Sequence, residues 1–201
     1  TYILFTAFRD FRDNFAAEIW TALGYGDVAG AFAISEAPVA IVVLAALGLI
    51  MVIKDNWRAV TVLHIAIALG AVTIGASTFA FQQGAIGPLA WMIISGAGLY
   101  VAYTPFSAML FDRLMAAAQF PGTATYLIYL ADASGYAGSV SLLITKEIFA
   151  PDLPWLPFFI GGAYTASAIG CVLTIASLAY FAKSKATTNS GLAPAAGALA
   201  T

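Results

Sequence analysis

Residues 59–111 read AVTVLHIAIALGAVTIGASTFAFQQGAIGPLAWMIISGAGLYVAYTPFSAMLF, a run of 53 positions without Asp, Glu, Lys or Arg. A transmembrane helix needs about 20 largely apolar residues, so this run is too long for one crossing and fits two. Glycine and proline in QQGAIGP, at 82–88, mark a turn between the crossings. The run therefore predicts two neighbouring membrane spans, at about 59–81 and 88–111.

The composition of the whole chain agrees with an integral membrane protein. Of its 201 residues, 62% are hydrophobic and 9% are charged, whereas soluble domains average about 25% charged residues. Long unbroken apolar runs favour helices over barrel strands, which alternate apolar and polar residues. A single cysteine, Cys171, excludes an internal disulfide. The net charge of −2 does not indicate a nucleic-acid partner, and we expect none.

Four further apolar segments complete an all-α fold of six transmembrane helices, at about 2–23, 31–53, 123–149 and 155–183. The remaining segment, 184–201, is low in complexity and is predicted to be a disordered tail. Six spans place both ends on one side, together with the second and fourth connections. That side carries seven basic residues, or five if Arg9 and Arg12 lie within the membrane, and the other carries only Lys146, so the positive-inside rule predicts cytoplasmic termini. The seven are Arg9, Arg12, Lys54, Arg58, Arg113, Lys183 and Lys185.

Polar residues are concentrated in the first, second, fourth and fifth spans, whereas the third and sixth resemble lipid-facing scaffold. Ionisable residues within a span usually face the interior of a bundle or a wet cavity. The fifth span shows this best, because a polar series with helical spacing lies opposite a series of small residues suited to packing. The polar series is Thr125, Tyr129, Asp132, Tyr136 and Ser139, and the small series is Ala131, Ser134, Gly135 and Gly138.

Asp132 lies near the middle of the fifth span. It is a candidate proton carrier, and the alternative is a buried structural carboxylate bonded to tyrosine hydroxyls or to an arginine. In the fourth span, Tyr100 and Thr104 have the same helical spacing and are candidates for hydrogen bonding to a solute. Pro105 follows them and predicts a kink, because proline removes a backbone hydrogen bond.

The first span contains the charged stretch RDFRDN, at 9–14. On a helix, Arg9 can pair with Asp13, and Asp10 and Asn14 have the same separation. Arg12 projects on another side, so at least one guanidinium is expected to remain free to bind a carboxylate or phosphate. The competing interpretation places 1–14 at the cytoplasmic surface as an amphipathic segment. Asp10 and Asp13, with Glu36 of the second span, are further candidates for carrying a coupling proton.

The order of polar and apolar spans resembles one half of a major facilitator superfamily transporter. The basic loop KDNWR, at 54–58, falls between the second and third helices, where that family has a short charged loop, although the family's fuller Gly-rich signature is absent. The stretches RDFRDNF, at 9–15, and YLIYLADASGYAGSV, at 126–140, also resemble an uncharacterised group of bacterial proteins with this fold. In that group they lie in the carboxy-terminal half. The resemblance implies a twelve-helix bundle, a missing amino-terminal six-helix half and a bacterial inner-membrane location.

The resulting hypothesis is a secondary active transporter that works by alternating access. A small polar solute, anionic if Arg12 binds it, would be held by Arg9, Arg12, Asn14, Tyr100, Thr104, Tyr129 and Tyr136. Coupling to protons would use Asp10, Asp13, Asp132 or Glu36. The expected partners are the lipid bilayer, the solute, protons and the other half of the bundle. No cofactor is expected.

Two other classes of function remain. One is a signalling or assembly subunit that keeps the fold without transporting anything. The other is an intramembrane enzyme, for which Gly75-Ala76-Ser77 supplies a nucleophile motif. The single histidine, His64, precedes that serine on the same span, and one His with one Cys offers no metal site. The sequence therefore argues against an enzyme.

Overall fold

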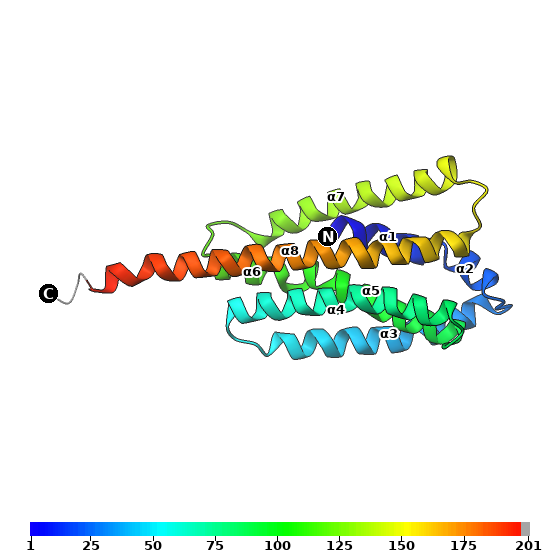
Figure 1. Cartoon of the computed structure of the whole chain (residues 1–201), viewed down its shortest axis with the longest axis horizontal. Coiled ribbons are helices and arrows are strands. Elements are labelled where there is room, and N and C mark those ends of the chain that lie inside the picture. Colours follow the sequence, from blue (N-terminus) through cyan, green and yellow to red (C-terminus); the bar gives the residue numbers. More distant parts are fainter. Residues whose placement is uncertain (198–201) are drawn as a thin grey trace.

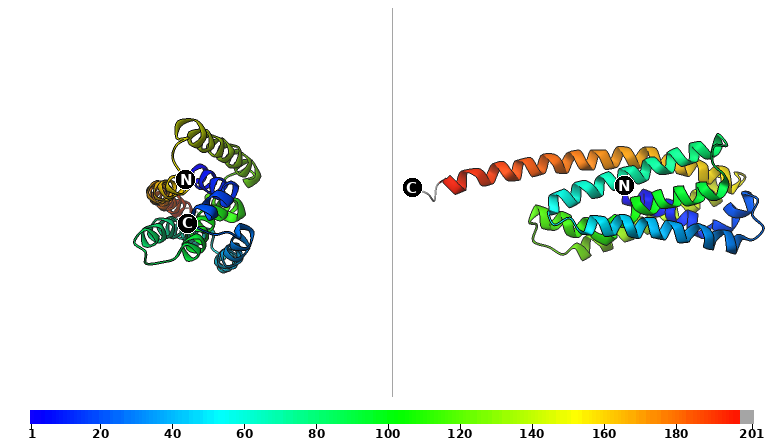
Figure 2. Two further views of the ribbon diagram at one scale, coloured as in Figure 1. Left: turned by 90° about the vertical axis from the view of Figure 1, so that its right-hand side faces the viewer. Right: turned by 90° about the horizontal axis from the view of Figure 1, so that it is seen from below.

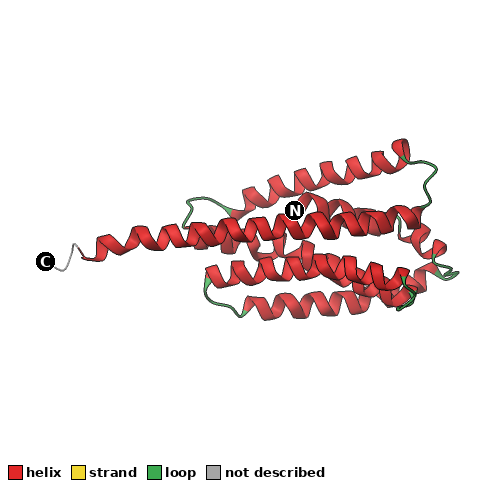
Figure 3. Ribbon diagram, viewed as in Figure 1, coloured by secondary structure: helices red, strands yellow, loops and turns green. Residues whose placement is uncertain are grey.

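The computed structural model describes the backbone of residues 1–197 and the side chains of residues 1–183. This part of the chain consists of helices and short connections, and no strand occurs in it (Figure 3). The helices run along one common direction and form an elongated bundle, from which the end of the last helix projects (Figure 1). Membrane-spanning segments form helices because the bilayer core has no water to hydrogen-bond the backbone, and a helix satisfies its backbone polar groups within the segment.

Helix starts and ends follow local capping chemistry. The carboxylate of Asp27 accepts a hydrogen bond from the backbone N–H of Gly30 at 2.9 Å, and that of Asp55 accepts one from Arg58 at 2.7 Å. Such caps satisfy N–H groups that the first turn leaves free. Pro88 occupies the first turn of its helix, where its missing N–H costs nothing. In the first half of the chain the helices are α1 (Tyr2–Asn14), α2 (Ala16–Ala22), α3 (Val28–Met51) and α4 (Asn56–Gln82).

The second half of the chain follows the same alternation of helix and short connection. Its two longest irregularities are π-helical turns, one directly after Pro105 and one at the end of the fifth crossing. A π-helical turn thus follows directly on Pro105, whose missing N–H removes a backbone bond, and the kink there stays a prediction. The elements are α5 (Pro88–Pro105), η1 (Phe106–Leu110), α6 (Phe111–Ala118), α7 (Ala124–Ile144), η2 (Thr145–Phe149) and α8 (Trp155–Gly197).

The first predicted span, 2–23, is not one helix. At Phe15 the backbone leaves helical geometry, with φ −111° and ψ 24°, and separates α1 from α2. The prediction of a continuous helix was therefore wrong. At this break Phe15 stacks on Trp155 of α8, with ring centroids 4.2 Å apart.

Five helical segments are long and apolar enough to cross a membrane, as expected of a multi-pass membrane protein. The predicted bounds differ from them by a few residues, except at Ala118, where the fourth crossing extends seven residues beyond the predicted 111. The predicted tail begins inside α8, and the side chains of 184–197 and all of 198–201 lie outside the described residues, so its disorder stays a prediction. The five segments are Val28–Met51, Asn56–Gln82, Pro88–Ala118, Ala124–Phe149 and Trp155–Lys183.

α4 is a central packing element and packs against both α5 and α8. It buries ten residues, among them Leu63, Ile67 and Ile74, while Leu69 and Phe79 are exposed on its other side. The prediction of a lipid-facing scaffold therefore fits one face of this helix, and the other face is core. Its contact with α5 is close, because a Cβ on Gly70 would lie 2.4 Å from the carbonyl oxygen of Gly98. Two glycines allow the two backbones to touch.

α1 and α7 pack against each other, as do α3 and α5. The small-residue face predicted on α7 makes the first of these contacts, since a Cβ on Gly135 would lie 2.9 Å from Thr6 and one on Gly138 would lie 2.5 Å from Ile3. Viewed along the bundle, α7 stands at its edge beside α1 (Figure 2). Gly135 is the one buried residue of α7, so most of this helix faces away from the other helices of the bundle.

Candidate functional site

The charged cluster of α1 lies at the level of the middle of the membrane spans. Asp10 accepts a hydrogen bond from the hydroxyl of Ser139, which is near the centre of the Ala124–Phe149 crossing. Asp13 accepts one from the Tyr100 hydroxyl at 2.7 Å, and Tyr100 lies near the centre of Pro88–Ala118. The cluster therefore does not project beyond the ends of the neighbouring helices.

Arg12 is buried, with 1% of its surface exposed. Its Nη2 atom donates to Glu36 Oε1 at 2.6 Å and to the carbonyl oxygen of Met92 at 3.4 Å, and its Nη1 donates to Asp13 at 3.3 Å. Gly96 leaves the room for this side chain, because a Cβ there would lie 2.7 Å from Nη2. The expectation of a free guanidinium at Arg12 was wrong. The group joins α1 to α3 and α5.

Arg9 also pairs differently from the expectation. It forms an ion pair with its neighbour Asp10, and no ion pair with Asp13 occurs among the described residues. The guanidinium carbon lies 4.3 Å from the ring centroid of Tyr103, a cation–π geometry. Pairs that are four apart on a helix were a reasonable expectation, but contacts with other helices decide the side-chain rotamers here.

Tyr2 and Tyr103 belong to this network and were missed from the sequence. The Tyr2 hydroxyl donates to Asp132, and its ring stacks on Tyr103 with centroids 5.5 Å apart. The Tyr103 ring in turn makes the cation–π contact with Arg9. The helical spacing could have indicated both residues, since Tyr2 lies seven positions before Arg9 and Tyr103 lies three after Tyr100.

A cavity of about 470 Å³ lies between α1 and α7, and we call it the α1–α7 groove. It brings together three of the predicted site residues: Asp10, Asn14 and Tyr136. Tyr136 is 64% exposed, so its hydroxyl and ring face remain accessible. The residues that line the groove are Asp10, Phe11, Asn14, Phe15, Tyr136, Ser139, Val140 and Leu143.

The other predicted site residues are distributed elsewhere. Glu36 and Tyr100 line a second cavity of about 370 Å³, between α3 and α5. Tyr129 is 70% exposed and Thr104 is half-buried, and neither has a side-chain hydrogen bond to the charged residues in the described part of the chain. The predicted residues thus form a groove and a neighbouring network instead of one continuous pocket.

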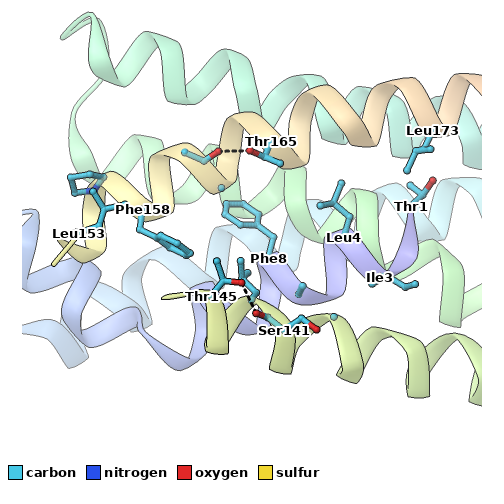
Figure 4. A pocket seen from close by; sticks show the side chains of 16 residues that line it. Thr1, Ile3, Leu4, Phe8, Ser141, Thr145, Leu153, Phe158, Thr165 and Leu173 are labelled. Carbon is cyan, nitrogen blue, oxygen red and sulfur yellow. Dashed lines mark hydrogen bonds between the residues drawn. The ribbon is translucent and has the colours of Figure 1, made fainter. Parts of the chain in front are cut away.

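A larger cavity, of about 720 Å³, lies on the other flank of α7, and none of the predicted site residues lines it. We call it the apolar groove. Figure 4 shows Phe8 and Leu4 of α1 lying between Ser141 and Thr145 from the α7 side and Phe158 and Thr165 of α8. Its hydroxyls are engaged with backbone carbonyls: Thr145 donates to Ser141, and Thr165 donates to Gly161. It therefore offers little polar chemistry.

The residues considered for an enzyme do not form a catalytic pair. The hydroxyl of Ser77 donates to the carbonyl of Ile74 at 3.1 Å. His64 bonds the carbonyl of Val60 and the hydroxyl of Ser177. Thirteen residues of helix separate His64 from Ser77, which corresponds to about 20 Å. Within the described residues, no three of the His, Cys, Asp and Glu side chains are grouped so as to hold a metal.

The sequence was compared with protein families, curated proteins and solved structures. Residues 1–184 match a family described as "Family of unknown function (DUF5690)". The chain belongs to this family. No curated protein and no solved structure matches it. The DUF5690 region contains the charged cluster of α1, both cavities that carry predicted residues, and all five spanning segments.

Proposed function

We propose that this chain is the carboxy-terminal six-helix half of a secondary active transporter of the bacterial inner membrane, working by alternating access. The observation that carries the proposal is the charged network of α1 at the middle of the spans. Charged side chains there are costly, and they usually mark a path for a solute or ions. The α1–α7 groove gives this network an accessible space.

In addition to the five long helices, α1 and α2 together would form one more crossing, the first in the chain, interrupted at Phe15. Discontinuous helices often border the substrate sites of transporters. With this crossing counted, the unit divides into two sets of three crossings. The first set is α1–α2, α3 and α4, and the second set is α5–α6, α7 and α8. The packing of α1 on α7 corresponds to that of α5 on α3, and the packing of α5 on α4 corresponds to that of α1 on α8. This correspondence supports the major facilitator architecture, whose halves contain inverted three-helix repeats.

The outward face of α7 supports a missing partner. Tyr126, Tyr129 and Tyr136 are each more than 60% exposed on a helix that crosses the membrane. Hydroxyls without partners are costly in hydrocarbon. A second six-helix half, with water between the halves, would satisfy them. This half is expected in the same membrane protein complex or polypeptide.

The orientation with cytoplasmic termini is supported by where basic residues gather. Arg113 bonds the Asn56 side chain at 3.0 Å and the Met51 carbonyl at 3.4 Å, so α6 meets the α3–α4 connection at one end of the bundle. That connection carries Lys54 and Arg58. Lys146 lies at the other end, stacked over Trp155. The positive-inside rule assigns the first end to the cytoplasm.

In this proposal Asp10 and Asp132 are the proton-carrying candidates, because Asp10 lines the α1–α7 groove and Asp132, on α7, is half-buried and has no ion pair among the described residues. Asp13 and Glu36 are held by Arg12 and would release it only if α3 and α5 moved. Arg12 then connects the moving helices and does not bind solute. The carrier needs neither an active-site nucleophile nor a cofactor.

The test is solute uptake into lipid vesicles that contain the full-length protein. Proton-driven uptake is expected with the unaltered protein, and Asp132→Asn should reduce it to near background while the thermal unfolding midpoint stays within a few degrees. Tyr126→Phe, on the same helix and outside the groove, is the matched control. Uptake that Asp132→Asn leaves unchanged would contradict the proton-carrying role. A folded protein that takes up no solute from any class tested would favour the non-transporting signalling or assembly subunit.

A further inference from the structure

The lining of the α1–α7 groove combines aromatic rings with an acid and an amide. Phe15 and Tyr136 line the groove with accessible rings, whereas Phe11, 4% exposed, packs its ring against Phe158 and Phe159 of α8. Asp10 and Asn14 supply the polar atoms. Aromatic faces carry negative electrostatic potential and attract cations, and they recognise quaternary ammonium groups in particular. A groove with two accessible rings, Phe15 and Tyr136, and a carboxylate nearby is suited to such a group.

Neither nearby arginine is available for an anion. Arg12 is buried and donates to Glu36 at 2.6 Å and to Asp13 at 3.3 Å. Arg9 is paired with Asp10 and covers the ring of Tyr103. An anionic solute would have to take a guanidinium from its carboxylate, which leaves a charge without its partner in a low-dielectric site.

The charged network and groove formed by α1, α3 and α7 contain four carboxylates and two guanidinium groups, and we call their surface the polar wall. The two cations are Arg9 and Arg12. The Tyr2 hydroxyl, a neutral group, donates to Asp132, and no ion pair among the described residues neutralises that carboxylate. A wall with excess negative charge raises the local concentration of cations. The four carboxylates are Asp10, Asp13, Glu36 and Asp132.

We propose that the α1–α7 groove binds a small organic cation, with its ammonium group against Phe15 and Tyr136. Asp132, one helical turn before Tyr136, supplies the compensating negative charge, because no ion pair among the described residues neutralises it, whereas Asp10 is already paired with Arg9. This inference rests on the proposed function, because it names the solute class for the same groove. It replaces the anionic solute that a free Arg12 would have implied.

The test uses three probes of nearly the same shape and different charge. The first is choline. The second is its neutral carbon isostere, in which a tert-butyl group replaces the trimethylammonium group, and the third is the corresponding tert-butyl carboxylate. Binding to the full-length protein in lipid nanodiscs is measured by calorimetry. Choline is expected to bind at least about tenfold more tightly than the neutral isostere, and the carboxylate is expected to bind most weakly.

Substitutions of one tyrosine separate ring from hydroxyl. Tyr136→Phe keeps the ring and should leave choline binding within about twofold, whereas Tyr136→Leu removes the ring and should weaken it about three- to tenfold. Tyr126→Leu removes an exposed tyrosine of the same helix that does not line the groove, so it should change nothing. Both positions are exposed, and thermal unfolding checks that each of the three variants is folded.

The outcomes separate this inference from the carrier proposal. Choline that binds but is not taken up by vesicles supports the cation site and contradicts the carrier. A carboxylate that binds best and is taken up supports the carrier and overturns the cation site. Equal binding of the three probes, binding of none of them, or equal effects of Tyr136→Leu and Tyr126→Leu would also overturn it.

Discussion

Arg12 connects three helices through one guanidinium group. Its partners are Glu36 on α3, the Met92 carbonyl on α5 and Asp13 on its own helix, and it is 1% exposed. Burying a charge is costly unless a partner and hydrogen bonds compensate it, and removing one member leaves the other uncompensated. The residue therefore stabilises the arrangement of α1, α3 and α5.

Replacing Arg12 alone should destabilise the protein more than replacing both Arg12 and Glu36. Arg12→Met leaves Glu36 unpaired and should lower the free energy of unfolding by about 3–5 kcal/mol, whereas adding Glu36→Met should restore at least half of that loss. Reversible unfolding in detergent by a chemical denaturant measures both. An Arg12→Met variant whose free energy of unfolding lies within about 1 kcal/mol of that of the unaltered protein would contradict this account of Arg12.

The hydroxyl and the ring of Tyr2 make separate contacts: the hydroxyl donates to Asp132, and the ring stacks on Tyr103. Tyr2→Phe keeps the stacking on Tyr103 and removes the donor to Asp132, so it should cost about 1.5–3 kcal/mol of unfolding free energy, as expected for a hydrogen bond to a charged group. Tyr126→Phe removes an exposed hydroxyl of α7 and should have no measurable effect. Equal effects from the two variants would show that the bond to Asp132 contributes nothing.

The sequence indicated which residues are polar within the spans, but not how they pair. Asp10, Asn14 and Tyr136 could be placed together, because helical spacing fixes the face that each presents. Spacing along one helix also suggested that Arg9 pairs with Asp13 and that Arg12 is free. The first failed because Arg9 pairs with its neighbour Asp10, and the second failed because Glu36, on another helix, pairs with Arg12. Contacts between helices are not encoded in the spacing within one of them.

At the scale of helices, the contact between α4 and α5 depends on two glycines. A methyl group on Gly70 would lie 2.4 Å from the Gly98 carbonyl oxygen, so the helices would have to separate. Gly70→Ala should therefore destabilise the protein by about 1–3 kcal/mol.

Gly48 provides the matched control for Gly70. It is also inside a helix, but nothing lies within 4 Å of an added Cβ, and the residue is exposed. Gly48→Ala should leave stability unchanged or raise it by about 0.5–1 kcal/mol, because alanine loses less backbone entropy in a helix. Thermal or chemical unfolding of the two variants compares them. A Gly70→Ala variant as stable as Gly48→Ala would contradict the close contact.

The helix positions were predictable because long apolar runs bounded by Gly, Pro and charged residues have few alternatives in a membrane. α4 begins at Asn56 and ends at Gln82, close to the predicted 59–81. The break at Phe15 was not predictable, since no proline or glycine marks it and its ring contact, with Trp155, is made with a helix distant in the sequence.

At the scale of the whole molecule, α7 separates two different environments. On one flank it forms the α1–α7 groove with charged and aromatic residues, and on the other it forms the apolar groove with α1 and α8. In the proposed transporter the first opens toward the partner half and water, and the second opens toward lipid. α7 would then rock between the two as access alternates.

The proposed orientation can be measured with single cysteines in a background in which Cys171 is replaced by alanine. Lys54→Cys lies in the α3–α4 connection, and Gln83→Cys lies between α4 and α5 at the opposite end. A membrane-impermeant thiol reagent added to right-side-out vesicles should label Gln83→Cys and not Lys54→Cys, and inside-out vesicles should give the reverse. The same sidedness for both positions would contradict the topology.

The central claim is that the charged cluster of α1 faces water inside the membrane, and two adjacent residues of α7 test it. Val140 lines the α1–α7 groove and Ser141 lines the apolar groove, at the same depth. A water-soluble thiol reagent reacts with the thiolate, which forms where water reaches the cysteine. In membranes and without Cys171, Val140→Cys should react at least about tenfold faster than Ser141→Cys. Equal rates, or a faster reaction at Ser141→Cys, would contradict the account.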